Sequence, residues 1–291
     1  MKWAKGLAAA CLVALAASTA SAQQQQDPFN GQFGSIALAL PPAEAARLAG
    51  LMGDALDALQ PQRPGEQDVY IISLSLWGDP VFEREASRAA EIMRTHLGAE
   101  GRTIVLSAGG QGQRTYPAAT PDNIAAAIGR VGALADRNED LVVLFLTTHG
   151  QPDGGAVIRE HNRMGGVLRP THLRDLFNAA NIRNRVVIVS ACFSGAFIAP
   201  LMDDNTIVLT AAAPDRTSFG CQPQNEWTFF GDAYFEQSMR QNGSMIAAFD
   251  DAKRLIERWE REQNLSPPSN PQRYVGQRAA EMLRQAERNA R

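Results

Sequence analysis

Two uninterrupted apolar runs dominate the hydrophobic pattern of the chain. Residues 141–147 and 186–190 consist mostly of β-branched and aliphatic side chains, the composition of strands that are buried on both faces. Reactive and flexible residues begin where each run ends: His149 follows the first run and Cys192 the second, each with a glycine within three residues. The pattern therefore predicts two buried strands, one ending in an imidazole and the other in a thiol.

Strands and helices alternate through the rest of the pattern. Further strands are expected at 69–76, 102–106 and 206–210, and helices at 44–59, 81–97, 120–134, 170–180, 226–241 and 244–262. Thr120 before Pro121 is a helix start, because a capping hydroxyl precedes proline in the first turn. Gly98 fits the left-handed residue that ends a helix, and residues 151–169 are expected to be a loop. This alternation predicts an α/β fold with a mostly parallel sheet and helices on both faces.

His149 and Cys192 are expected at the carboxyl ends of consecutive strands, which pair about 5 Å apart and form the edge where functional residues gather. A cysteine thiol with a pKa of about 8.5 is mostly protonated at neutral pH, so a neighbouring imidazole supplies the reactive thiolate. Cys192 would attack a carbonyl carbon and His149 would protonate the leaving amine. The backbone N–H groups of Gly150 and Cys192 would bind the oxyanion, and Gly150 lets substrate lie against the backbone.

Each of these residues also has a structural interpretation. His149 could cap a strand, and Cys192 could be a small buried hydrophobe or one half of a disulfide with Cys221. A free Cys192 is favoured, because a large core does not need a lone bridge. His161 is the rival base, and Ser194 lacks the Gly-x-Ser-x-Gly setting of a serine nucleophile. No His-Glu-x-x-His and no Cys-x-x-Cys occur, so neither a metal nor another cofactor is expected.

The first 22 residues have the form of a secretory signal peptide. Lys2 and Lys5 precede an apolar stretch, and Ala20-Ser21-Ala22 forms a small-residue cleavage site. We therefore expect a periplasmic or secreted protein with no membrane-spanning segment after signal removal. The net charge of −3 and the absence of alternating aromatic and basic residues argue against nucleic-acid binding. The expected organisation is a signal peptide at 1–22, an N-terminal extension or propeptide at 23–66, a main domain at 67–263 and a C-terminal tail at 264–291.

A series of motifs resembles the legumain-type cysteine peptidases of the caspase-like clan, and the likeness is closest to short bacterial members. The motifs are Thr147-Thr-His149-Gly150, Ser190-Ala-Cys192-Phe-Ser-Gly195, the block from Thr210 to Cys221, and Phe230-Gly-Asp232. The resemblance covers roughly residues 68–262. It implies a caspase-like three-layer α/β/α sandwich and an enzyme that acts on a peptide or protein substrate after Asn or Asp.

By position, His149 and Cys192 match the catalytic dyad of this family, and Gly150 matches its oxyanion contribution. The substrate-binding pocket positions are matched by Arg84, Ser190 and Ser218. Legumains typically have glutamate two residues before the cysteine, where this chain has Ser190. The serine puts a strict asparagine preference in doubt.

The leading prediction is an exported cysteine-type endopeptidase that forms a thioester acyl-enzyme. One alternative is a transamidase or transpeptidase of the same family, in which an amine resolves the thioester. Water access and amine binding decide between these two outcomes. A second alternative is a catalytically inactive caspase-like binding module, against which the intact His149, Gly150 and Cys192 argue.

Overall fold

The structure, a computed structural model, describes residues 41–109, 115–160 and 164–291. The described residues, from Pro41 onward, belong to one compact unit. The predicted signal peptide, the first part of the predicted extension and His161 lie outside the described residues. Within the described ranges, no helix is both long and apolar enough to cross a lipid bilayer.

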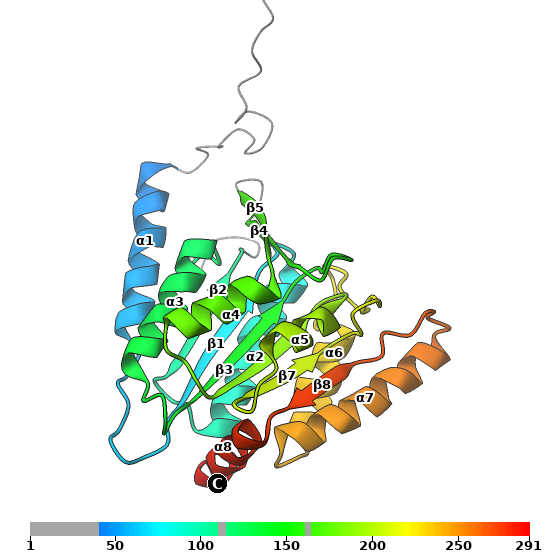
Figure 1. Ribbon diagram of the computed structural model, residues 1–291. Helices are drawn as coiled ribbons and strands as arrows, with labels where there is room; N and C mark the ends of the chain where they lie inside the picture. The colour runs from blue at the N-terminus through cyan, green and yellow to red at the C-terminus, as the bar shows by residue number, and fades with distance from the viewer. Residues whose placement is uncertain (1–40, 110–114, 161–163) are drawn as a thin grey trace, which may run out of the picture. The chain divides into compact units, whose positions relative to one another are not determined.

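A six-stranded sheet in the order β2-β1-β3-β6-β7-β8 forms the centre of the fold (Figure 1). Its strands are β1 (Val69–Ser75), β2 (Thr103–Ser107), β3 (Leu141–Thr147), β6 (Arg185–Ser190), β7 (Thr206–Thr210) and β8 (Gln272–Val275). The first five are parallel, and β8 pairs antiparallel with β7 at one edge. The two apolar runs form β3 and β6, which are neighbours and are buried along their whole length. The predicted parallel sheet is therefore confirmed.

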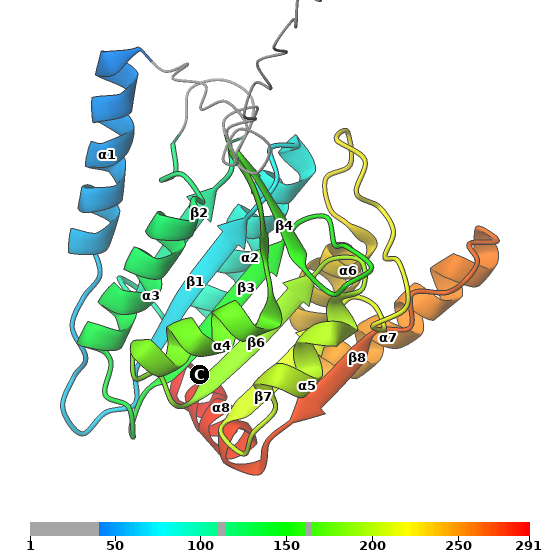
Figure 2. The same ribbon diagram turned by 45° about the horizontal axis from the view of Figure 1, so that its top comes forward.

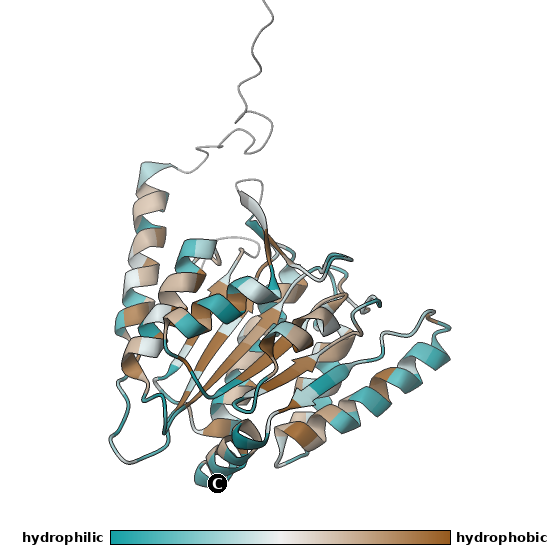
Figure 3. Cartoon of the chain, in the orientation of Figure 1, coloured by the Kyte–Doolittle hydropathy of each residue, from teal (hydrophilic) through white to brown (hydrophobic). Residues whose placement is uncertain are grey.

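Helices cover both faces of this sheet (Figures 1 and 2). They are α1 (Pro42–Asp57), α2 (Pro80–Leu97), α3 (Pro121–Leu134), α4 (Pro170–Ala179), α5 (Ile198–Leu201), α6 (Phe229–Gly231), α7 (Met245–Glu262) and α8 (Gln277–Asn289). Alternate residues of β3 face opposite sides, so Phe145 packs in the core with α2, α7 and α8, and Leu144 packs with α3 and α4. Figure 3 shows the result, apolar strands between helices that carry both polar and apolar residues. The predicted three-layer α/β/α sandwich is confirmed.

Local sequence signals fix several helix ends. The Thr120 hydroxyl accepts a hydrogen bond from the Asn123 N–H at 3.2 Å, so α3 begins at Pro121. Gly98 closes α2 in the left-handed conformation with φ of 62°. Both ends agree with the sequence prediction.

The predicted loop at 151–169 is wrong in part, because it contains a hairpin of β4 (Ala156–Glu160) and β5 (Met164–Leu168). These strands pair with each other in a separate two-stranded sheet. The sequence Arg159-Glu160 in β4 and the two glycines of β5 interrupt any apolar run. Glycine and glutamate are depleted in strands, so residue preferences give little signal here.

The segment predicted as one helix at 226–241 begins later and is mostly not α-helical. It starts with α6 at Phe229 and continues as the π-helix η2 (Asp232–Met239). The Thr228 hydroxyl accepts the Gly231 N–H at 3.0 Å and so fixes the start. The predicted C-terminal tail contributes β8 to the sheet and α8 to the core, where Ala279 and Leu283 are buried.

Candidate active site

His149 and Cys192 lie just beyond neighbouring strand ends. In the parallel pair β3–β6, Thr147 is opposite Ser190, so each candidate lies two residues past the same paired position. The pairing extends further, because the Thr148 N–H donates to the Ser190 carbonyl at 3.1 Å. Both His149 and Cys192 are half-buried. The fold thus brings the imidazole-bearing and thiol-bearing segments together at the carboxyl edge of the sheet.

The ring of His149 packs against two aromatic side chains. Trp77 and Phe82 meet it edge-on, with ring centroids at 4.8 Å and 5.0 Å. Burial lowers the pKa of His149, and the Asp79 carboxylate at the start of α2 partly opposes this shift. The neutral imidazole, the form that accepts a proton, therefore persists to lower pH than in an exposed histidine.

The sulfur of Cys192 lies against the chain segment that follows β7. The Ser218 N–H donates to Sγ at 3.3 Å, and the Ser218 hydroxyl lies 3.7 Å from Sγ. Phe193 has the left-handed conformation with φ of 58°, which costs free energy for an aromatic residue. Its N–H donates to the Arg216 carbonyl at 2.7 Å. These two hydrogen bonds, one to the Cys192 sulfur and one between backbone groups, hold the turn after β6 onto the segment that contains Arg216 and Ser218.

Close backbone approach explains two glycines and one serine of this region. A Cβ on Gly150 would overlap the carbonyl oxygen of Cys192, and a Cβ on Gly195 would lie 2.6 Å from the Pro214 nitrogen. Ser194 is only 1 % exposed, and its hydroxyl accepts the Ala212 N–H at 3.0 Å. The serine of the Cys-Phe-Ser-Gly motif is thus used to hold two chain segments together.

The predicted pocket serines have different surroundings. Ser218 lies beside the sulfur of Cys192, as described above. Ser190 is 2 % exposed, and its hydroxyl donates to the Glu85 carboxylate at 3.0 Å. The structure therefore brings Ser218 to the thiol and turns Ser190 towards the interior under α2.

Arg84, the predicted pocket base, binds the segment before α6. Its guanidinium donates to the Pro223 carbonyl at 2.8 Å and to the Asn225 carbonyl, and lies 3.8 Å from the Glu226 carboxylate. Arg88, one turn later, makes a closer ion pair with Glu226 at 2.7 Å. A role of Arg84 in substrate binding stays a prediction.

Glu85 is a residue of this region that the sequence analysis missed. Its carboxylate is fully buried and accepts hydroxyl hydrogen bonds from Thr147 at 2.9 Å, Ser190 at 3.0 Å and Thr228 at 2.9 Å. Burial raises the pKa of Glu85 to about 7, although these hydrogen bonds oppose the shift. The available signal was its spacing on α2, three residues after Phe82, which places a charge on the buried face of the helix.

Both cysteines of the described chain are free. Cys221 is half-buried, and burial raises the pKa of its thiol, with a further contribution from Cys192. In the described residues, no group of three or more His, Cys, Asp or Glu side chains is arranged to hold a metal ion.

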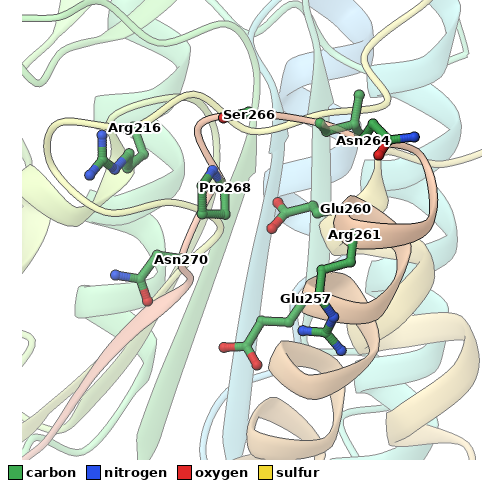
Figure 4. A pocket seen from close by; sticks show the side chains of 9 residues that line it. Arg216, Glu257, Glu260, Arg261, Asn264, Ser266, Pro268 and Asn270 are labelled. Carbon is green, nitrogen blue, oxygen red and sulfur yellow. The ribbon is translucent and has the colours of Figure 1, made fainter.

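A cavity of about 660 Å³ is lined mainly by residues near the end of α7 and the segment that follows it (Figure 4). It lies between the C-terminal turns of α7 and the segment 264–270, with Glu257, Arg261 and Asn270 in its wall. Arg216 also lines it, and the carbonyl of this residue binds Phe193 next to Cys192. Because neither His149 nor Cys192 lines the cavity, we place the chemistry at the strand ends and not in this cavity.

The chain has a caspase-like fold. Caspase-1 from Spodoptera frugiperda has a similar structure, with a TM-score of 0.51 and 12% identity over 75% of this chain and 89% of that chain. At this identity the likeness shows the fold alone. No curated protein sequence matches the chain significantly.

The family is shown by sequence. The profile of the Peptidase C13 family matches residues 112–277, a span that includes His149 and Cys192. The chain belongs to the Peptidase C13 family, and the legumain-type resemblance of its motifs is confirmed. Bacterial origin and the individual site roles stay predictions.

Proposed function

We propose that the protein is a cysteine endopeptidase in which Cys192 is the nucleophile and His149 transfers the protons. The observation that carries this proposal is the register of β3 and β6, which places both residues two positions beyond one paired position. The C13 family match supports a peptidase-type function. The low pKa of His149 supports its role as a proton acceptor near neutral pH.

The reaction follows from these two side chains. His149 takes the thiol proton as Sγ of Cys192 attacks the carbonyl carbon of a peptide bond. It then gives this proton to the nitrogen of the leaving amine as the C–N bond breaks, which leaves a thioester. Water attacks the thioester and passes a proton through His149 to the departing sulfur, so an acid is released and the free thiol returns.

Backbone groups are proposed to stabilise the tetrahedral intermediate. The N–H groups of Gly150 and Cys192 lie in two segments whose backbones touch. Donors fixed in advance where negative charge develops lower the barrier more than mobile donors do. Gly150 has no side chain, and the carbonyl of Cys192 occupies the place that a Cβ would take there.

The proposed substrate is a peptide or protein, and the family likeness implies cleavage after Asn or Asp. Ser190 holds the position of the typical glutamate, and its hydroxyl is bound to Glu85. The acid nearest to that position is therefore Glu85, on another element. Export to the periplasm or outside the cell is proposed from the first 22 residues alone.

Peptide cleavage tests the proposed activity. The chain from Gln23 onward, Cys192→Ala and the matched control Cys221→Ala would each be incubated with a diverse peptide library, and the products read by mass spectrometry. We expect cuts by the first and third proteins and none by Cys192→Ala, with the residue before each cut giving the preference.

Two further outcomes would redirect the assignment. New amide products in the presence of an added amine would identify a transamidase. A library left intact by a folded protein whose Cys192 also resists alkylation would favour a binding module.

A further inference from the structure

We propose that Glu85 is a positioning residue of the active site, whose buried carboxylate holds together the two strand ends that carry His149 and Cys192. This inference rests on the proposed function only for what the two strand ends do. The geometry itself is independent of it. One carboxylate oxygen of Glu85 accepts the Thr147 hydroxyl, and the other accepts the Ser190 hydroxyl.

The Glu85 carboxylate thus forms a bridge between Thr147 and Ser190, which are opposite each other at the end of the β3–β6 pair. His149 and Cys192 each follow by two residues, roughly 7 Å along an extended chain. A carboxylate that is hydrogen-bonded to both paired residues fixes where, and in which direction, the two segments leave the sheet. Small errors there matter, because a displacement of about 1 Å in a catalytic group can reduce turnover about 100-fold.

A third contact joins the bridge to the other side of the site. The Thr228 hydroxyl donates to Glu85 at 2.9 Å and also accepts the Gly231 N–H that starts α6. Gly231 lies so close that a Cβ there would overlap the Glu85 carboxylate. Glu85 thus links β3, β6 and the start of α6 at one point under the strand ends.

The same helix also holds the histidine ring. Phe82, in the first turn of α2, packs on His149, and Glu85 follows one turn later. A shift of α2 would therefore move the ring contact and the strand bridge together. The helix α2 therefore keeps the relative position of the imidazole and the thiol constant.

Two other buried acids have a different setting. Glu260 accepts the Ser269 N–H, and Glu287 accepts the Met245 N–H, so each of these binds the backbone of a connecting segment. Glu85 instead binds side-chain hydroxyls at the ends of both strands that carry the dyad. Complete burial of a carboxylate is costly, and an apolar residue at position 85 would leave three buried hydroxyls without this acceptor.

Several charged and titratable groups lie near Glu85, so its own proton is studied by comparison with Glu85→Gln. On its own helix, Arg84 and Arg88 bind the 223–226 segment and Glu226. Glu85 contributes to the raised pKa of the Cys221 thiol. Burial raises the pKa of Glu85 itself to about 7, so the difference between the wild-type and Glu85→Gln profiles across the neutral range reports on this residue.

Glu85→Gln tests the proposal, with Glu260→Gln as the matched control for loss of a buried carboxylate elsewhere. For each protein we would measure kcat and KM on a cleaved peptide, the rate of Cys192 alkylation by iodoacetamide from pH 5 to 9, and the melting temperature. Glu85→Gln is expected to lower kcat about 10- to 100-fold with little change in KM, and to remove an inflection near pH 7 from the alkylation profile. Glu260→Gln is expected to keep the wild-type profile whatever its melting temperature.

The proposal would be overturned if Glu85→Gln kept both the wild-type kcat and the wild-type alkylation profile. If Glu85→Gln does not fold, Thr147→Val and Ser190→Ala each remove one arm of the bridge and leave the carboxylate in place. Unchanged kcat and alkylation profiles in both would then reject it. Alkylation needs no peptidase activity, so a wild-type protein that cleaves nothing would count against the proposed function and leave the test of Glu85 intact.

Discussion

Gly150 and Cys192 touch through their backbones, so closely that a side-chain atom on Gly150 would overlap the carbonyl oxygen of Cys192. The glycine after the histidine is therefore required by the approach of two chain segments. This contact keeps the N–H groups that we propose for oxyanion binding in neighbouring positions. Even a single added methyl group at residue 150 would therefore disturb this contact.

Gly150→Ala is expected to reduce kcat/KM about 100-fold or more, because the added methyl group must push the two segments apart. Overpacking of this kind costs about 1–3 kcal/mol of stability. Gly129→Ala is the matched control, since a Cβ there meets no atom within 4 Å and the residue lies inside α3. It should be fully active and about 0.5–1 kcal/mol more stable. Peptide cleavage and thermal melts of the two variants would test this prediction. Wild-type activity in Gly150→Ala would show that the contact between the two segments is unimportant for catalysis.

The pH dependence of activity should reflect the environment of His149. Burial lowers its pKa, so the neutral base form is kept below pH 6.5 and the acidic limb of kcat/KM is expected below that value. Asp79 raises the pKa of His149, so Asp79→Asn should move the limb to still lower pH. Peptide cleavage from pH 4 to 8 measures both shifts, and a limb that moves upward in Asp79→Asn would contradict this assignment.

Glu85 should make the protein less stable as the pH rises. Its pKa is about 7 in the folded state and about 4.5 in the unfolded chain. Between pH 4.5 and pH 7 the folded state therefore binds more protons than the unfolded state. The contribution of Glu85 is complete below about pH 4.5 and is lost as the pH rises through 7, on the order of 3 kcal/mol in total. Denaturant unfolding from pH 4.5 to 8 should show this loss in the wild type relative to Glu85→Gln, and parallel curves would refute it.

The two cysteines should differ in reactivity. Burial raises the pKa of Cys221 and so reduces its thiolate at neutral pH. Iodoacetamide at pH 7.5 is therefore expected to label Cys192 before Cys221 in the native protein, as peptide mapping would show. Thiol counting on the unreduced, unfolded chain from Gln23 onward should give two free thiols, and a count of zero would reveal a disulfide.

Arg84 should hold the segment before α6 through its two carbonyl contacts. Arg84→Ala is expected to increase hydrogen exchange at residues 221–227, whereas Arg88→Ala, which removes one ion pair with Glu226, should have a smaller effect. A rise in KM without faster exchange in Arg84→Ala would instead favour the substrate-binding role predicted from the family likeness.

The strands that carry the candidate dyad could be predicted because they are unbroken apolar runs, and parallel sheets bury such runs on both faces. The rule that chemistry gathers at carboxyl ends of strands then placed His149 beside Cys192. The sequence did not predict the β4–β5 hairpin. Its strands pair through backbone contacts, and the run Met164-Gly-Gly has none of the apolar alternation that is typical of a strand. Glu85 was missed for a similar reason: its partners Thr147 and Thr228 are 62 and 143 residues away.

The antiparallel strand β8 has a consequence for self-association. It is four residues long, and Arg273 within it pairs with Asp250 of α7 at 2.8 Å. A short, charged edge strand is a poor template for strand addition by another molecule. Loss of the last 20 residues would uncover β7, whose Ile207, Val208 and Leu209 are completely buried. We therefore expect residues 272–291 to limit strand addition by another molecule at this edge of the sheet.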